Sequence, residues 1–110
     1  MGASLLEFHV LLALAGGARH GYAIAERVAA ESGGTLRPRA GSLYRVIARL
    51  INQGLVAESE DEVEAPHPGL TRRYYVLTAT GRRTLGEEAR RLKQAAAAAE
   101  KRLGLARGRS

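Results

Sequence analysis

The 110-residue sequence contains no cysteine, no tryptophan, one phenylalanine and three prolines. Without cysteine it can form neither a disulfide framework nor a thiolate metal site, although this absence fits reducing and oxidising compartments alike. Its three histidines share no helical spacing and no carboxylate pattern, so we expect no metal site. Glycine-rich phosphate loops, nucleophile elbows and paired-carboxylate motifs are also absent, and we therefore expect neither enzymatic activity nor a cofactor.

No hydrophobic run is long enough to cross a bilayer. Residues 5–15 form the most apolar stretch, but it is shorter than the roughly 20 residues of a transmembrane helix, and Glu7 and His9 interrupt it. It also lacks the basic leader and the clear small-residue cleavage site of a signal peptide. We therefore expect a cytoplasmic protein that does not bind membranes.

The net charge of +6 suggests a polyanionic partner, but the position of the charge is more informative than its sum. Residues 82–110 hold nine of the 17 basic residues and three of the 11 acidic ones. A solvated helix face with a disordered tail explains this excess better than contact with DNA. Within residues 1–81, acids cluster at 58–64, and the bases cluster at Arg37, Arg39, Arg45, Arg49, Arg72 and Arg73.

Residues 42–53 predict a short amphipathic helix with one apolar and one polar face. The apolar side chains recur three and four apart, at Leu43, Val46, Ile47, Leu50 and Ile51. Gly54 supplies the left-handed residue that commonly ends a helix. The opposite face offers hydroxyl, guanidinium and amide groups that suit phosphates and base edges.

The surroundings of this helix predict a winged helix-turn-helix fold, mostly α with a small β-hairpin. Another helix is expected at residues 22–32, and strands are expected at 55–59 and 72–77. Leu36 and Arg37 could add a minimal strand against this hairpin, the wing. A helix-turn-helix followed by a hairpin indicates nucleic-acid binding.

A long C-terminal helix is expected over residues 79–105, with Thr78 as its N-cap. Apolar residues recur along it at spacings of four and three, at Leu85, Ala89, Leu92, Ala96, Ala99 and Leu103. The helix could fold back on its own domain. In a homodimer, this helix would instead pack on the first helix of the other subunit. That first helix, at 5–15, is apolar on nearly every side, with Leu5, Phe8 and Leu12 among its side chains, and must also be covered. We thus expect a DNA-binding domain at 1–78, a dimerisation helix at 79–105 and a disordered tail at 106–110.

Several short motifs occur together, and their combination resembles the PadR family of bacterial transcriptional regulators. They are LLAL at 11–14, HGY at 20–22, GSLY at 41–44, GLV at 54–56, RYYVLT at 73–78 and GR at 81–82. The short C-terminal region is similar to the compact branch of the family. The resemblance implies a homodimeric repressor that a small molecule releases from DNA, and a small apolar or aromatic compound is the candidate effector. Because its two subunits are symmetric, we expect its operator to be a pseudo-palindrome in double-stranded DNA.

The sequence departs from the family pattern in three places. Arg45 occupies a position that is commonly proline, so DNA contacts there can differ. The wing carries acids, which leaves its phosphate contacts to Arg72 and Arg73, of which we favour Arg73. Without tryptophan, the aromatic sandwich with which some compact members hold flat drugs is missing.

Further DNA contacts are assigned with their alternatives. Arg45 is the best candidate to read a base, because a guanidinium fork matches the two acceptors of guanine. Tyr44 either contacts a phosphate or sugar or is a half-buried core ring, and Tyr22 either places its hydroxyl on the DNA backbone or packs under the turn. Ser42 either caps its helix or binds phosphate. Arg39 and Arg49 are candidate phosphate contacts that could equally be solvated surface. A protein-interaction scaffold and a ligand carrier remain as alternative functions.

Overall fold

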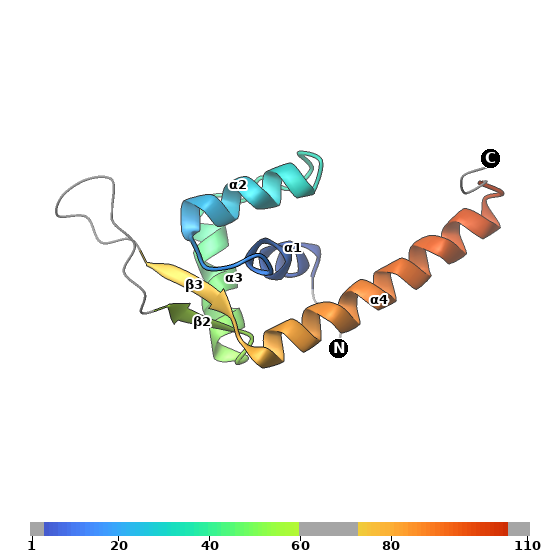
Figure 1. Cartoon of the computed structure of the whole chain (residues 1–110). Helices are drawn as coiled ribbons and strands as arrows, with labels where there is room; N and C mark the ends of the chain where they lie inside the picture. The colour runs from blue at the N-terminus through green and yellow to red at the C-terminus, as the bar shows by residue number, and fades with distance from the viewer. Residues whose placement is uncertain (1–3, 60–72, 106–110) are drawn as a thin grey trace.

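The computed structural model describes residues 4–59 and 73–105, and over these ranges the chain forms four helices and a small sheet (Figure 1). The predicted wing tip, Arg72 and the predicted tail at 106–110 lie outside the described residues. The elements follow in the order α1 (Leu5–Leu14), β1 (Arg19–His20), α2 (Gly21–Glu31), α3 (Ala40–Asn52), β2 (Val56–Ser59), β3 (Tyr74–Leu77) and α4 (Ala79–Arg102). The predicted fold, a mostly helical winged helix-turn-helix with a long C-terminal helix, is confirmed.

Helix α1 begins at a capping box that Ser4 and Glu7 form. The Ser4 hydroxyl accepts a hydrogen bond from the Glu7 N–H at 3.1 Å, and the Ser4 N–H donates to Glu7 Oε1 at 2.8 Å. This reciprocal pair satisfies two backbone donors that a helix start otherwise leaves without partners. The Glu7 side chain is therefore fixed at the first turn of α1.

The core lies where α1, α2 and α3 meet one face of the sheet. Its largest fully buried side chains are Leu11, Leu14, Ile24, Leu43, Ile47 and Leu50. Helix α3 contributes the apolar stripe that its periodicity predicts. It ends at Asn52, and Gly54 follows the C-cap Gln53 with a φ of 77°, the left-handed value expected after a helix end. The opposite face of α3 therefore remains at the surface.

The sheet has the strand order β1-β3-β2 and is antiparallel throughout. The strand that joins the β2–β3 hairpin is β1, Arg19–His20. The prediction that Leu36 and Arg37 form this strand is therefore wrong. The Leu36 N–H instead donates to the Ser32 hydroxyl at 2.9 Å, which ties this segment to the end of α2. Arg19 reaches the edge of β3 because the turn after α1 leads there directly, and its Nε donates to the Ala13 carbonyl at 2.7 Å.

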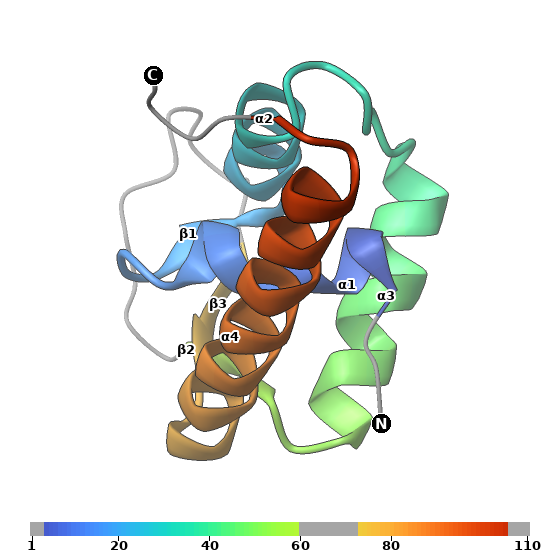
Figure 2. The ribbon, with the colours of Figure 1, turned by 90° about the vertical axis from the view of Figure 1, so that its right-hand side faces the viewer.

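Helix α4 is anchored at its first turn and then leaves the body of the domain (Figure 1). Its N-cap is Thr78, as predicted, and the Thr78 hydroxyl accepts from the Gly81 N–H at 2.9 Å. The helix crosses α1 (Figure 2), and Leu85 packs against the core there. Residues 89–105 are exposed except for the half-buried Ala98 and Glu100. No described helix has the length and apolar character that a membrane crossing requires.

Candidate nucleic-acid interface

The outward face of α3 carries the candidate base-reading residues. Tyr44, Arg45, Ala48, Arg49 and Asn52 are exposed on it, opposite the buried stripe. Within the described residues, no hydrogen bond or ion pair holds the Arg45 guanidinium. This arginine is therefore available to an external partner.

Tyr44 joins α3 to the start of α2. Its ring lies over Gly21, where an added Cβ atom would come within 2.7 Å of Tyr44 Cζ and closer still to the hydroxyl oxygen. Only glycine at position 21 leaves room for the Tyr44 ring. The HGY and GSLY motifs are therefore in direct contact through these two residues. Tyr44 nevertheless remains 48% exposed, so packing on Gly21 and contact with a ligand are compatible.

A small aromatic group surrounds the N-terminus of α2. His20 is its N-cap, and the Ala23 N–H donates to His20 Nδ1 at 3.2 Å. The His20 ring stacks on Tyr22 with 6.4 Å between centroids and meets Tyr74 edge-on at 5.5 Å. Tyr22 is exposed, so its hydroxyl is available at the same end of α2 that Tyr44 approaches.

Arg39 and Ser42 lie at the N-terminus of α3. Arg39 is the N-cap and makes no side-chain capping hydrogen bond, so the capping role considered for Ser42 is wrong. Helix α3 starts at Ala40, two residues before the predicted start, which places Ser42 inside its first turn. Both residues line a surface hollow of about 330 Å³ together with Leu6, Thr35, Leu36, Arg37 and Pro38.

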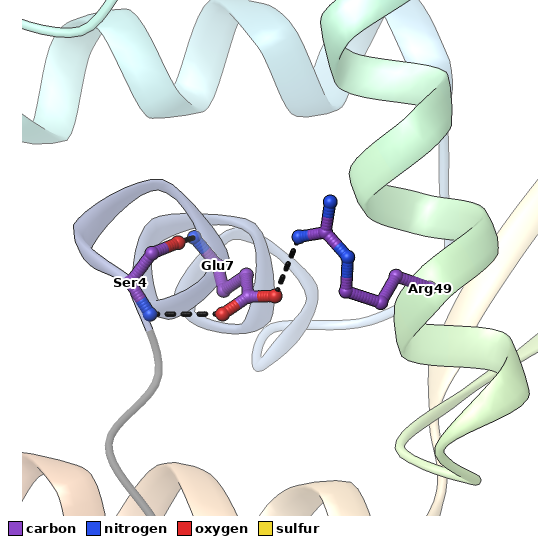
Figure 3. Close-up of polar contacts among 3 residues, drawn as sticks. All are labelled: Ser4, Glu7 and Arg49. Carbon is purple, nitrogen blue, oxygen red and sulfur yellow. Dashed lines mark hydrogen bonds and ion pairs between the residues drawn. The ribbon is translucent and has the colours of Figure 1, made fainter.

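Arg49 does not point freely outward. Its Nη1 donates to Glu7 Oε2 at 2.8 Å, across the gap between α3 and α1 (Figure 3). The hydrogen bond from the Ser4 backbone N–H lowers the pKa of Glu7 more than burial raises it, and Arg49 lowers this pKa further. The phosphate contact predicted for Arg49 stays a prediction, and it competes with this ion pair.

The wing presents its arginine beside an acid. Arg73 Nη1 donates to Glu58 Oε2 at 3.1 Å, and both side chains are exposed. Exposed ion pairs contribute only about 0 to 1 kcal/mol, so a phosphate can replace Glu58 at small cost. On β3, which follows Arg73, Tyr75 is buried and Tyr74 is half-buried, as expected for strand side chains that alternate between the two faces of the sheet. Burial raises the pKa of Tyr75.

The predicted dimerisation residues divide into an anchored part and an uncovered part. Leu85 packs on the core, whereas Leu92 is 41% exposed and Leu103 is 72% exposed. Ala89, Ala96 and Ala99 are exposed between them. On α1, Leu5 is exposed and Phe8 and Leu12 are half-buried. Apolar side chains on α1 and α4 therefore remain in contact with solvent in the single chain.

The sequence reasoning missed Glu7 as a part of this region. The Ser4-x-x-Glu7 spacing is a recognisable capping-box signal, but it does not indicate that Glu7 also binds Arg49. For His20 the sequence predicted a hydrogen bond to this turn, and the structure confirms it, although histidine is not among the residues preferred as N-caps. Within the described residues, no group of histidine and carboxylate side chains could hold a metal ion.

Comparison with known proteins identifies the family. A model of the PadR-like family of transcriptional regulators matches residues 10–87. No curated protein sequence matches the chain. One similar solved structure is a PadR family transcription regulator from Clostridium difficile, with 18% identity and a TM-score of 0.75 over 91% of this chain and 99% of that one.

Two further structures share the fold. A PadR-like transcription factor from Bacteroides fragilis is 28% identical, with a TM-score of 0.70 over 88% of each chain. Bacillus subtilis PadR, solved in complex with operator DNA, is 21% identical, with a TM-score of 0.64 over 76% of this chain and 46% of that one. Because the family model spans the helix-turn-helix, both described wing strands and the start of α4, the chain belongs to the PadR-like family of transcriptional regulators.

Proposed function

We propose that this transcriptional regulator is a homodimer that binds a pseudo-palindromic operator in duplex DNA and represses transcription. The observation that carries this proposal is the outward face of α3, on which Arg45 has no partner within the described residues. The major groove admits an α-helix, and a guanidinium fork fits the O6 and N7 acceptors of guanine. Arg45 would therefore read a base.

The neighbouring groups would position α3 on the duplex. The hydroxyls of Tyr22 and Tyr44 lie at the N-terminus of α2, and Arg39 and Ser42 lie at the N-terminus of α3. Helix N-termini favour phosphate because their N–H groups and dipoles point toward it. Of the two wing arginines, Arg72 and Arg73, we favour Arg73 to add a phosphate contact. The Bacillus subtilis relative was solved with operator DNA, which supports DNA as the partner of these groups.

The uncovered apolar side chains of α1 and α4 support the homodimer. A second copy that places its α4 on this α1 would bury Leu5, Phe8 and Leu12 against Leu92 and the alanines of the partner helix. Alanine permits the two helices to approach closely. A symmetric pair of α3 helices would then address two half-sites about 10 base pairs apart.

A small apolar or aromatic effector, bound between the two subunits, would release the regulator from its operator. The supporting observation is the apolar character of the same α1 and α4 surfaces, where Phe8 lies half-buried and edge-on to His9 at 5.6 Å. We place the regulator in the cytoplasm, where operator DNA is found. The test is binding of an apolar fluorescent dye. The dye should bind saturably, and operator binding should weaken when the dye is bound.

DNA recognition is tested with duplexes selected from random sequence. Arg45→Ala is expected to weaken binding to the selected duplex roughly tenfold to hundredfold, with little change on an unselected duplex, because one bidentate base contact contributes about 1 to 3 kcal/mol. Arg90→Ala, which removes an exposed arginine from α4, is the matched control. Equal losses on both duplexes would make Arg45 a phosphate contact, and no loss on either would exclude Arg45 as a DNA contact. A selection that enriches no duplex would favour a protein-interaction scaffold.

A further inference from the structure

Glu7 holds the second outward arginine of α3. The two Glu7 carboxylate oxygens are both used, one by the Ser4 backbone N–H and the other by Arg49 Nη1, each at 2.8 Å (Figure 3). The Glu7 side chain is 10% exposed and that of Arg49 is 52% exposed. The carboxylate is thus fixed in place, whereas the guanidinium it holds is close enough to solvent to reach another anion if released.

Both helices favour this ion pair where it stands. Glu7 lies in the first turn of α1, where the helix dipole stabilises a negative charge. Arg49 lies in the last turn of α3, where the dipole stabilises a positive charge. Release of Arg49 would leave a nearly buried carboxylate without its cationic partner, which is unfavourable. The pair is therefore expected to persist when α3 meets DNA.

The Glu7–Arg49 ion pair affects DNA binding because of where Arg49 lies on α3. Arg49 follows Arg45 by one turn of α3, so the two guanidinium groups leave the same side of the helix. A free Arg49 would attract any phosphate, whatever the sequence nearby. We propose that Glu7 limits the sequence-independent part of DNA affinity by keeping the Arg49 guanidinium on α1 and away from phosphates. This inference rests on the DNA binding proposed above.

The test is a double-mutant cycle in Glu7 and Arg49, read as the dependence of DNA affinity on salt. Glutamine is the suitable replacement for Glu7, because it also serves at this position of a capping box. Glu7→Gln is expected to steepen the slope of log affinity against log salt by about 0.9 per subunit on an unselected duplex, and by about twice that for a dimer. Arg49→Gln alone should leave the slope unchanged, and adding it to Glu7→Gln should restore the original slope.

Two controls separate this effect from simpler ones. Glu31→Gln removes the same charge from the ion pair with Arg27 at the end of α2 and should leave the slope unchanged. Thermal unfolding establishes that each variant is folded. Because a purely structural role of Glu7 would change stability without adding a phosphate contact, the salt slope distinguishes the two roles.

Three results decide the matter. A shallower slope for Arg49→Gln alone would show that Arg49 already contacts phosphate and would overturn the proposal. Equal slopes for Glu7→Gln and Glu31→Gln would overturn it as well. If the unaltered protein binds no duplex in a salt-dependent way, the DNA-binding function itself fails, and this outcome is distinguishable from a flat cycle in a protein that does bind.

Discussion

The contact between Gly21 and Tyr44 predicts an unusual response to a glycine-to-alanine substitution. Neither Gly21 nor Gly41 has a positive φ, and each lies in the first turn of a helix. Alanine at such a site normally stabilises a protein by about 0.4 to 1 kcal/mol, because it restricts the unfolded chain. Gly41→Ala should follow this rule, since nothing lies within 4 Å of the Cβ position.

Gly21→Ala should instead destabilise the protein. The new methyl group would overlap the Tyr44 hydroxyl and stand 2.7 Å from its Cζ atom, so the ring would have to move. Overpacking costs about 1 to 3 kcal/mol, and the partly exposed ring can yield outward, which favours the lower half of that range. After the alanine gain is subtracted, we expect a net loss of about 1 kcal/mol, or about 4 to 8 °C in Tm.

Chemical denaturation of four proteins measures this effect: the unaltered chain, Gly21→Ala, Tyr44→Ala and the double variant. Removal of the ring should remove the clash, so Gly21→Ala should be stabilising in the Tyr44→Ala background, by about as much as Gly41→Ala. A Gly21→Ala protein as stable as Gly41→Ala would refute the reasoning, and so would equal effects of Gly21→Ala in both backgrounds.

Three further predictions concern the proposed dimer, the anchor of α4 and the capping carboxylate. Leu92→Glu places a charge in the proposed seam and should shift sedimentation from dimer to monomer and abolish tight operator binding; an unchanged dimer would locate the interface elsewhere. Gly81→Ala should cost about 3 kcal/mol or more in denaturant unfolding, because the added Cβ would lie 2.9 Å from the Leu55 carbonyl carbon and closer still to its oxygen, whereas Gly86→Ala, whose nearest atom lies at 3.8 Å, should cost nothing. The folded protein lowers the pKa of Glu7, so the stabilisation from its carboxylate should be present above the unfolded value of about 4.3 and should decrease as pH falls through the lower folded value. Unfolding free energies measured down to about pH 3 should therefore converge between the unaltered protein and Glu7→Gln, and a constant difference would contradict this assignment.

Local sequence signals predicted most of the fold. The apolar spacing at Leu43, Ile47 and Leu50 predicted the buried face of α3, and Thr78 and Gly54 predicted a helix start and a helix end. These signals succeed because side-chain periodicity and capping depend on residues within about one helical turn of each other. Each predicted helix end lies within a few residues of the observed one.

Predictions from local sequence were wrong where a residue could take either of two backbone arrangements. Leu36 could extend along the wing or complete the turn after α2, and the hydrogen bond with Ser32 selects the turn. Ser42 could cap α3 or lie inside it, and the earlier start of the helix at Ala40 places it inside. In both cases the competing backbone arrangements used the same short stretch of sequence.

The sequence by itself determined which faces of the helices are apolar, where α2 through α4 begin and end to within a few residues, and which family the chain resembles. Only the tertiary structure decided the partners of the polar side chains on those faces. Glu7 and Arg49 are 42 positions apart, and they meet because α1 lies beside α3. Tyr44 requires glycine at position 21 because α3 brings its ring against the start of α2. Periodicity records the side of a helix that is buried, whereas the partner of an arginine or a tyrosine depends on how two helices pack, which neither local sequence contains.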